Sequence, residues 1–264
     1  MPFSRSSPPR CELLSKPERK EVTVAEAILN NGISITYLGH ACFSIVSQDT
    51  SLLIDPWITG NPQAPESAKD LAKPDAILIT HAHGDHLGDA LSIAKRTGAS
   101  TVSMPEIAHY LVRKGLAADK AIGMNKGGTV TVRDARVTMV HALHSSSLIE
   151  DNQVIYGGEA AGFIILFKTG FSLYHAGDTG VFGDMKIIGE MYRPEVALVP
   201  IGDHYVMGPS EAAYACKLLK PKLVIPMHYG TFSVLTGTPE KFQALMQELP
   251  EIKILVLKPG EAIS

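Results

Sequence analysis

Three histidines and one aspartate are concentrated in residues 80–86, which have the sequence THAHGDH. The stretch ends the apolar run at residues 75–80, DAILIT, whose composition predicts a buried strand. Buried imidazoles and carboxylates cost free energy unless they are paired or bind a metal, and crowded imidazoles repel one another once protonated. Metal ligation removes both costs. The HxHxDH pattern therefore indicates a metal site more strongly than a set of hydrogen-bonded histidines.

Further histidines and aspartates follow other predicted strands in the same way. They are His141 and His144 in VTMVHALHSSS, Asp178 in FSLYHAGDTG and His228 in LVIPMHYG. Loops at strand ends are free to present side chains, and α/β proteins place their ligand sites there. Imidazole and carboxylate donors together suit Zn²⁺, Mn²⁺ or iron, and these segments offer no cysteine ligand. We therefore expect several strands to deliver one metal centre to a common edge.

Hydrophobic periodicity and turn residues predict the elements that must position these side chains. The expected strands cover residues 33–38, 42–46, 52–55, 76–80, 99–104, 129–142, 162–167, 171–175, 196–201, 223–226 and 252–257. The expected helices cover residues 22–29, 87–97, 105–114, 210–219 and 239–248. Hairpin turns are expected at residues 134–136 and 169–170. Two similar halves in this order would pack sheet on sheet with helices outside.

The composition is that of an ordinary globular protein of 264 residues, 45% hydrophobic and 19% charged. A formal net charge of −3, without long charge runs, argues against a nucleic-acid partner. No segment approaches the roughly 18 apolar residues that a membrane span requires. Three cysteines lie far apart without CxxC spacing, which favours reduced thiols and a cytoplasmic location.

Residues 1–31 differ from the rest of the chain. They begin with MPFSRSSPPRCELLSKPERK, which is rich in Ser, Pro and Arg and lacks the apolar core of a secretory signal. We expect a flexible N-terminal extension with one short helix, and organellar targeting is the less favoured alternative. No shift in composition marks a boundary further along the chain, so residues 32–264 are expected to form a single domain.

Several motifs together are similar to one protein family. In the family's order, the chain contains LGHACF, LIDPWITGNP, THAHGDHLGD, AGDTGVFGDMK, IGDHYVMGP and VIPMHYGTF. On these motifs it resembles the metallo-β-lactamase superfamily over residues 33–263, and within it a group of metal-dependent hydrolases related to the ascorbate-6-phosphate lactonases. The resemblance implies an α/β fold, the four-layer αββα sandwich, with a two-metal site at one edge of its sheets. It also implies a homo-oligomer, because the related lactonases assemble.

The resemblance also assigns metal ligands, residue by residue. It gives one metal to His81, His83 and His144 and the second to Asp85, His86 and His228, with Asp178 bridging both. His144 is preferred to His141 because the family's histidine precedes a small polar residue. Asp55 in LLIDP matches an aspartate that supports the ligand loop by accepting a hydrogen bond from a ligating imidazole. A supporting role and a purely structural role are equally compatible with His40.

Hydrolysis by activated water is the chemistry that the resemblance implies. Two divalent ions, zinc first and manganese or iron as alternatives, would share a solvent molecule and lower its pKa so that it supplies hydroxide at neutral pH. They would also polarise the carbonyl or phosphoryl oxygen of an ester, lactone, amide or phosphodiester. Asp85, His204 or a metal-bound water would protonate the leaving group. Tyr205 and Ser145 are the candidate contacts to a small-molecule substrate.

Two alternatives stay open. A small metal-dependent phosphodiesterase or nuclease would use the same centre, although a chain of this length and charge has little room for an RNA-binding arm. A non-catalytic metal-binding protein would keep the ions for structure or sensing, and such sites are normally closed by protein ligands. Redox chemistry is disfavoured, because the family's flavodiiron members carry glutamate at the position of His83.

Overall fold

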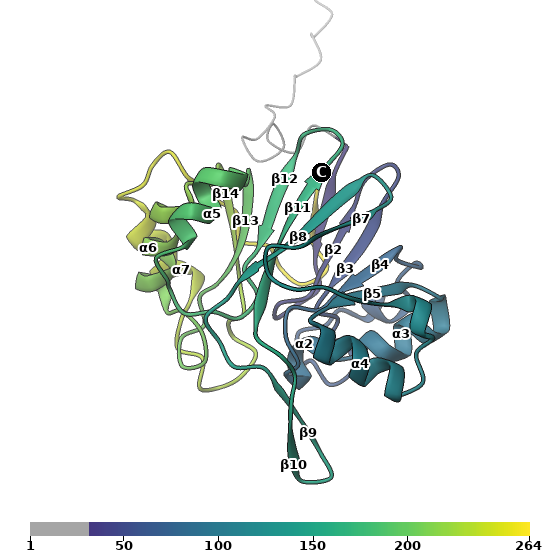
Figure 1. The fold of residues 1–264 in the computed structure, drawn as a ribbon. Helices are drawn as coiled ribbons and strands as arrows, with labels where there is room; N and C mark the ends of the chain where they lie inside the picture. Colours follow the sequence, from purple (N-terminus) through teal and green to yellow (C-terminus); the bar gives the residue numbers. More distant parts are fainter. Residues whose placement is uncertain (1–31) are drawn as a thin grey trace, which may run out of the picture.

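The computed structural model describes residues 32–264. Two large β-sheets lie face to face at its centre, and helices flank them on both outer sides (Figure 1). The extension predicted for residues 1–31, with its helix at 22–29, lies outside the described residues. Within the part of the chain that is described, no helix has both the length and the apolar character needed to cross a bilayer.

The first sheet has seven strands in the order β16-β1-β2-β3-β4-β5-β6. Their bounds are β16 (Ala262–Ile263), β1 (Ser34–Tyr37), β2 (Phe43–Val46), β3 (Ser51–Ile54), β4 (Ala76–Leu78), β5 (Ser100–Ser103) and β6 (Ala121–Gly123). Strand β1 pairs antiparallel with both β16 and β2, and β2 pairs antiparallel with β3. The remaining pairs, from β3 to β6, are parallel.

The second sheet also has seven strands, in the order β15-β14-β13-β12-β11-β8-β7. Their bounds are β15 (Lys253–Ile254), β14 (Leu223–Met227), β13 (Val196–Pro200), β12 (Ser172–His175), β11 (Ala161–Phe167), β8 (Ala135–His141) and β7 (Thr129–Val132). The pairs from β7 to β12 are antiparallel and those from β12 to β15 are parallel. Each sheet thus combines antiparallel hairpins with parallel strand–helix units.

Helices cover the outer face of each sheet (Figure 1). Those on the first half are α2 (Gly84–Leu87), α3 (Ala90–Thr97) and α4 (Pro105–Arg113). Those on the second half are α5 (Met185–Tyr192), α6 (Pro209–Leu219) and α7 (Pro239–Met246). Two 3₁₀ turns complete the helical elements, at Glu66–Asp70 and Ala118–Lys120. The helix–sheet–sheet–helix order is the predicted αββα sandwich.

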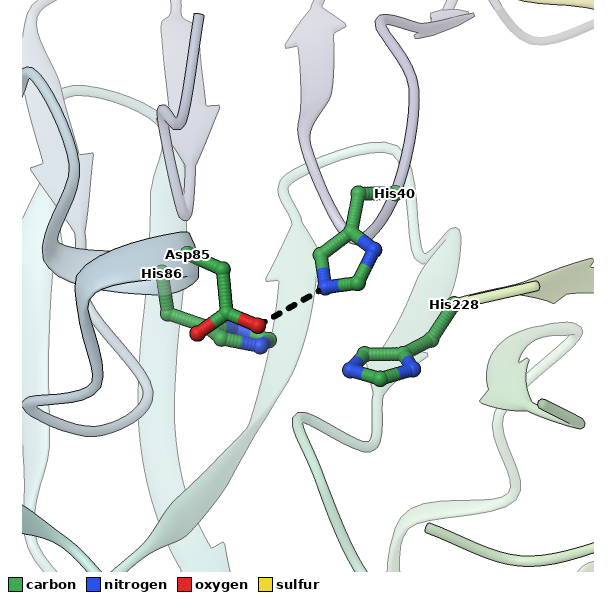
Figure 2. Close-up of side chains that lie close together, drawn as sticks. All are labelled: His40, Asp85, His86 and His228. Carbon is green, nitrogen blue, oxygen red and sulfur yellow. Dashed lines mark hydrogen bonds and ion pairs between the residues drawn. The ribbon is translucent and has the colours of Figure 1, made fainter. Parts of the chain in front are cut away.

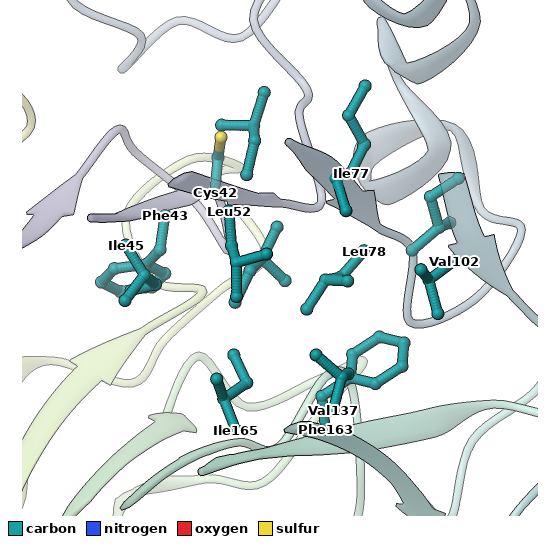
Figure 3. Packing of buried hydrophobic residues seen from close by; sticks show 14 of the residues in the cluster. Cys42, Phe43, Ile45, Leu52, Ile77, Leu78, Val102, Val137, Phe163 and Ile165 are labelled. Atoms are coloured by element: carbon teal, nitrogen blue, oxygen red, sulfur yellow. The ribbon is translucent and has the colours of Figure 1, made fainter. Parts of the chain in front are cut away.

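Apolar side chains from both sheets fill the space between them. Figure 3 shows Phe43, Ile45 and Leu78 of the first sheet facing Phe163 and Ile165 of the second. All of these side chains are completely buried. A separate apolar cluster joins the outer face of the second sheet to its three helices. Burial of this apolar surface, at about 25 cal/mol per Å², is the main force that fixes one sheet against the other.

Several predicted boundaries are corrected by the structure. The last strand, expected over residues 252–257, is β15 alone, although Leu255 N still donates to Val224 O. The hairpin turn between β7 and β8 lies at residues 133–134 instead of 134–136. Helix α5 was not predicted because Gly189 interrupts its pattern of helix-forming residues. That glycine permits close packing, since a Cβ there would lie 2.6 Å from Leu219 O in α6.

A two-stranded hairpin outside both sheets was also not predicted. It consists of β9 (Ser147–Glu150) and β10 (Gln153–Tyr156). Its two turn residues, Asp151 and Asn152, have φ angles of 48° and 58°. Positive φ at both positions is the geometry of the tight turn whose twist matches a β-hairpin, and Asp and Asn tolerate it. The local turn signal was present, but its flanking strands lack the alternation of apolar and polar residues that marks a half-buried strand.

We expect that replacing Gly202 with Ala destabilises the protein. Gly202 follows β13, and a Cβ there would lie 2.0 Å from the backbone oxygen of His228. Because backbone must move to relieve this overlap, the free energy of unfolding should fall by about 1–3 kcal/mol. Urea unfolding measures it. Gly183→Ala is the control, because a methyl group there meets nothing within 4 Å. Equal stability of the two variants would contradict the close approach.

Candidate metal centre

The carboxylate of Asp178 lies at the centre of the polar cluster. Asp178 follows β12 and is 3% exposed. Its Oδ2 atom lies 3.1 Å from His228 Nε2, 3.6 Å from His144 Nε2 and 3.9 Å from His81 Nε2. Its Oδ1 atom lies 3.2 Å from His86 Nε2. One carboxylate therefore faces four imidazoles, two of which come from loops of the first sheet and two from loops of the second.

His81, His83 and His144 form one group of possible metal donors. One ring nitrogen of each histidine lies within 4.8 Å of one ring nitrogen of the other two. His81 Nε2 is 3.0 Å from His83 Nδ1, and the rings of His83 and His144 meet edge to face at 5.1 Å. His141 points elsewhere and its Nδ1 accepts a hydrogen bond from Lys126 Nζ at 2.9 Å. The geometry thus places His144, and not His141, beside the HxHxDH segment.

His40, Asp85, His86 and His228 form a second group, again with donor atoms within 4.8 Å of one another (Figure 2). Asp85 and His86 lie in the short helix α2, and His228 follows β14. His40 Nε2 lies 3.2 Å from Asp85 Oδ2, and its ring centroid is 3.9 Å from that of His228. The sequence left the role of His40 open. The structure places its ring nitrogen among the donors.

Asp55 fixes the orientation of the His86 ring from the side opposite to Asp178. The Asp55 carboxylate accepts hydrogen bonds from Thr80 N at 2.8 Å, from Thr80 Oγ1 at 2.6 Å and from His86 Nδ1 at 2.8 Å. All three residues are fully buried. A proton held on Nδ1 leaves His86 Nε2 free and directs it toward Asp178. This is the supporting arrangement that ligating histidines typically have.

His40 is positioned by residues that sequence analysis did not single out. Its Nδ1 is 2.9 Å from Thr231 Oγ1, and its backbone N–H donates to Gln63 Oε1 at 3.2 Å. Thr231 also donates to Gln63 Oε1, so the three residues form a closed network. Both partners lie in or beside quoted motifs, since Thr231 belongs to VIPMHYGTF and Gln63 follows LIDPWITGNP. Their position in or next to these motifs was the sequence signal that could have identified Gln63 and Thr231 as residues near the site.

Three residues of the cluster have left-handed backbone conformations. The φ angles are 58° at His40, 46° at Asp55 and 56° at His228. Such conformations cost non-glycine residues roughly 1–2 kcal/mol each and tend to occur at functional sites, where surrounding structure enforces them. Here His228 N donates to His40 O at 2.8 Å and links two of the three directly.

The pKa shifts of His81, His40 and Asp178 favour the protonation states that metal binding needs, whereas that of His86 favours its protonated form. Burial lowers the pKa of His81, and it lowers the pKa of His40 to about 4. Burial would raise the pKa of Asp178, but the neighbouring imidazoles of His228 and His86 hold that pKa well below its usual value. Burial would lower the pKa of His86, yet Asp178 and Asp55 raise it overall. An ionised carboxylate among mostly neutral imidazoles attracts positive charge.

Unpaired buried atoms give a test of whether these residues fit a metal. Within residues 32–264, His86 Nε2, Asp178 Oδ1 and both ring nitrogens of His228 are buried without a hydrogen-bond partner. Buried polar atoms are nearly always paired. Three of these atoms point into the cluster of donors, where a cation would satisfy them. The nitrogen and oxygen donors, without sulfur, fit zinc, manganese or iron.

A cavity of about 420 Å³ opens onto the cluster. It is lined by His83, Asp85, His144, Ser145, Asp178, Tyr205 and His228. The two predicted substrate contacts, Ser145 and Tyr205, are both among these lining residues. Ser145 Oγ lies 3.4 Å from His83 Nε2. His204 is not among the lining residues. Its ring packs edge to face against Tyr205 at 4.4 Å.

A larger cavity, about 650 Å³, lies between α5 and α6 and has no donor cluster. Its lining includes several cations. Two of them, Arg193 and Lys220, occupy the C-terminal caps of these helices. Cations are stabilising at that end of a helix because they face the negative end of its dipole. The smaller cavity at Asp178 is therefore the candidate site.

Comparison with known proteins matches both the fold and the motifs. The β-lactamase superfamily domain model matches residues 50–229. A UPF0173 metal-dependent hydrolase of Koribacter versatilis is 50% identical over 234 residues, which cover 88% of this chain and 98% of the relative. One from Methanosarcina mazei is 48% identical over 231 residues, again covering 88% and 98%. The structure of Igni18, a metallo hydrolase from Ignicoccus hospitalis, has a TM-score of 0.77 at 40% identity, covering 88% of this chain and 97% of that one.

We expect that replacing Asp55 with Asn weakens metal binding. The amide cannot accept all three hydrogen bonds from Thr80 and His86, so the His86 ring loses its fixed orientation. Loss of such a partner typically lowers metal affinity 10–100-fold. Titration of Zn²⁺ against a competing chelator measures this affinity. Asp49→Asn, at an exposed turn, is the control. Unaltered affinity in the Asp55 variant would contradict its supporting role.

Proposed function

Because the chain belongs to the metallo-β-lactamase superfamily and is a metal-dependent hydrolase, we propose that it works with a dinuclear metal centre on a small-molecule substrate. The proposed ligands are His81, His83 and His144 for one ion, Asp85, His86 and His228 for the other, and Asp178 between them. When bound, the ions supply an acidified water and polarise the electrophile.

The position of Asp178 between the two donor groups is the observation that carries this proposal. Its Oδ2 atom lies nearest to His228, His144 and His81, and its Oδ1 atom lies nearest to His86. A carboxylate with neighbours on both oxygens is suited to contact two ions at once. Two-metal sites typically hold their ions about 3.5–4 Å apart, a separation that one carboxylate can bridge.

Asp85 is the proposed proton carrier. It lines the cavity, and its side chain is 24% exposed. Burial would raise its pKa, but the hydrogen bond with His40 and the charge interactions with His86 and His40 together hold the pKa below its usual value. Asp85 is therefore ionised at neutral pH and able to accept a proton that it later returns to the leaving group. Since His204 does not line the cavity, its proposed part is to position Tyr205, whose hydroxyl would contact the substrate together with Ser145.

The cavity favours an uncharged ester, lactone or amide over a phosphodiester. Its described lining contains no lysine or arginine, so an anionic substrate would find only hydroxyl groups and the ions themselves. The phosphodiesterase alternative therefore ranks second. An open cavity at the donors also supports catalysis over a purely structural metal, whose protein ligands normally close the site.

Zinc is the proposed metal, since imidazole and carboxylate donors both suit it, and manganese and iron share this donor chemistry. A cytoplasmic location is proposed from the cysteines. Cys42 and Cys216 are free and fully buried in separate parts of the fold. Burial raises the pKa of both thiols, to about 12 for Cys216, which keeps them as unreactive thiols.

We expect chelation to abolish hydrolysis and added Zn²⁺ or Mn²⁺ to restore it. Elemental analysis of purified protein should give two ions per chain. Hydrolysis is then measured on a panel of neutral esters, lactones and amides, with phosphodiesters included for comparison. Activity that survives complete metal removal would contradict metal-dependent catalysis. A single tightly held ion with full activity would contradict the dinuclear centre.

His83→Ala should lower kcat/KM by at least about 100-fold, the upper end of what loss of a supporting partner alone costs. It should also lower the metal content. His141→Ala is the matched control, since His141 accepts a hydrogen bond from Lys126 and takes no part in the cluster. If both variants retained activity and metal, His83 would not be a ligand.

A further inference from the structure

The β9–β10 hairpin, residues 147–156, forms an arm that extends away from the two sheets (Figure 1). Its inner face belongs to the body of the protein, because Leu148 is buried and Ile155 packs against the main core. Its outer face is apolar but exposed. Ile149 is 77% exposed, Val154 74% and Tyr156 66%.

These three side chains form one continuous patch. Ile149 and Val154 are paired directly across the hairpin, and Tyr156 lies two residues further on the same face. A hairpin with one face on the core normally has polar residues on the other. Apolar residues on both faces break that rule. A contiguous exposed apolar patch marks a surface that binds something.

The arm is held in place and does not hang as a free flap. At its base, Ser146 Oγ donates to Gly157 O at 3.0 Å and accepts from Ala82 N at 3.2 Å. Near its tip, Glu150 forms an ion pair with Lys114 at the end of α4. A two-stranded hairpin is only marginally stable alone. These contacts fix its direction but leave the outer face uncovered.

A groove of about 450 Å³ runs between α4 and the arm. Tyr110 and Arg113 of α4 line it on one side, and Ile155 and Tyr156 of the arm line it on the other. The exposed guanidinium of Arg113 has no ion pair within residues 32–264. The exposed carboxylate of Asp151, at the tip of the arm, has none there either. Arg113 of the groove and Asp151 of the arm therefore carry opposite unpaired charges beside a shared apolar surface, and Glu106 places a carboxylate at the other end of α4.

We propose that this surface binds a second copy of the same chain, with the arm of each copy lying in the groove of the other. A two-fold interface requires one patch that is complementary to itself. Arm and groove are such a patch, because they adjoin at Tyr156 and have complementary charges. In the pair, Asp151 of one copy meets the partner's Arg113, and Ile149 and Val154 pack into the apolar groove.

The surface area that a stable dimer must bury requires both the arm and the groove of each copy. A stable interface buries about 800 Å² on each partner, which is more than three side chains supply. Arm and groove together give a larger surface. The arm begins two positions after Ser145, and none of its residues lines the cavity at Asp178.

Sedimentation equilibrium of the full chain over micromolar concentrations tests the proposal without reference to activity. The expected mass is twice the chain mass of 28.4 kDa. Ile149→Ser combined with Val154→Ser should raise the dissociation constant by about 100-fold or more, as loss of central apolar contacts does. Met191→Ser is the control. It is 68% exposed on α5, far along the chain from the arm, and should leave the mass unchanged.

A charge exchange tests the pairing itself. Arg113→Asp and Asp151→Arg should each weaken association, because each places like charges together, and the double variant should restore it. A wild-type monomer throughout the concentration range would overturn the proposal. So would a double variant that stays dissociated, or arm variants that change KM while the mass stays that of the pair, since the last result would make the arm a substrate contact.

Discussion

The buried carboxylate of Asp178 is the constraint around which the molecule is organised. A carboxylate that is 3% exposed needs compensation, and four imidazoles provide its immediate surroundings. Two of these imidazoles, on His81 and His86, belong to the first sheet's loops, whereas Asp178 belongs to the second. The charge can therefore be accommodated only when the two sheets are in their final alignment. The apolar layer between the sheets and the polar cluster at their edge each depend on the other.

Much of this arrangement follows from local sequence patterns. Apolar runs followed by His or Asp predict strands with donors at their ends, and they predict that distant segments converge. In the structure, His144 lies beside the HxHxDH segment, whereas His141 contacts Lys126. The contacts of Gln63 and Thr231 with His40 could not be predicted, because these residues are far from His40 in the sequence. Gln63 is 23 positions away and Thr231 is 191 positions away. Such contacts depend on tertiary packing, which periodicity does not encode.

Two elements that were not predicted, and one strand that is shorter than predicted, share a physical cause. Helix α5 contains a glycine that lowers helix propensity but permits close packing on α6. The β9–β10 hairpin lacks alternation because both its faces are apolar. Strand β15 is short although the residues after it are apolar too. In each case a tertiary requirement prevails over the local pattern, and two of these segments lie at packing contacts or on an exposed surface.

The division of the donor set between two sheets also orders events during protein synthesis. A growing chain presents His81, His83 and His86 long before Asp178 and His228 have been made. Without Asp178, the nascent first half lacks the carboxylate that faces four imidazoles in the folded protein. The complete set of donor side chains therefore exists only after the second half has docked on the first.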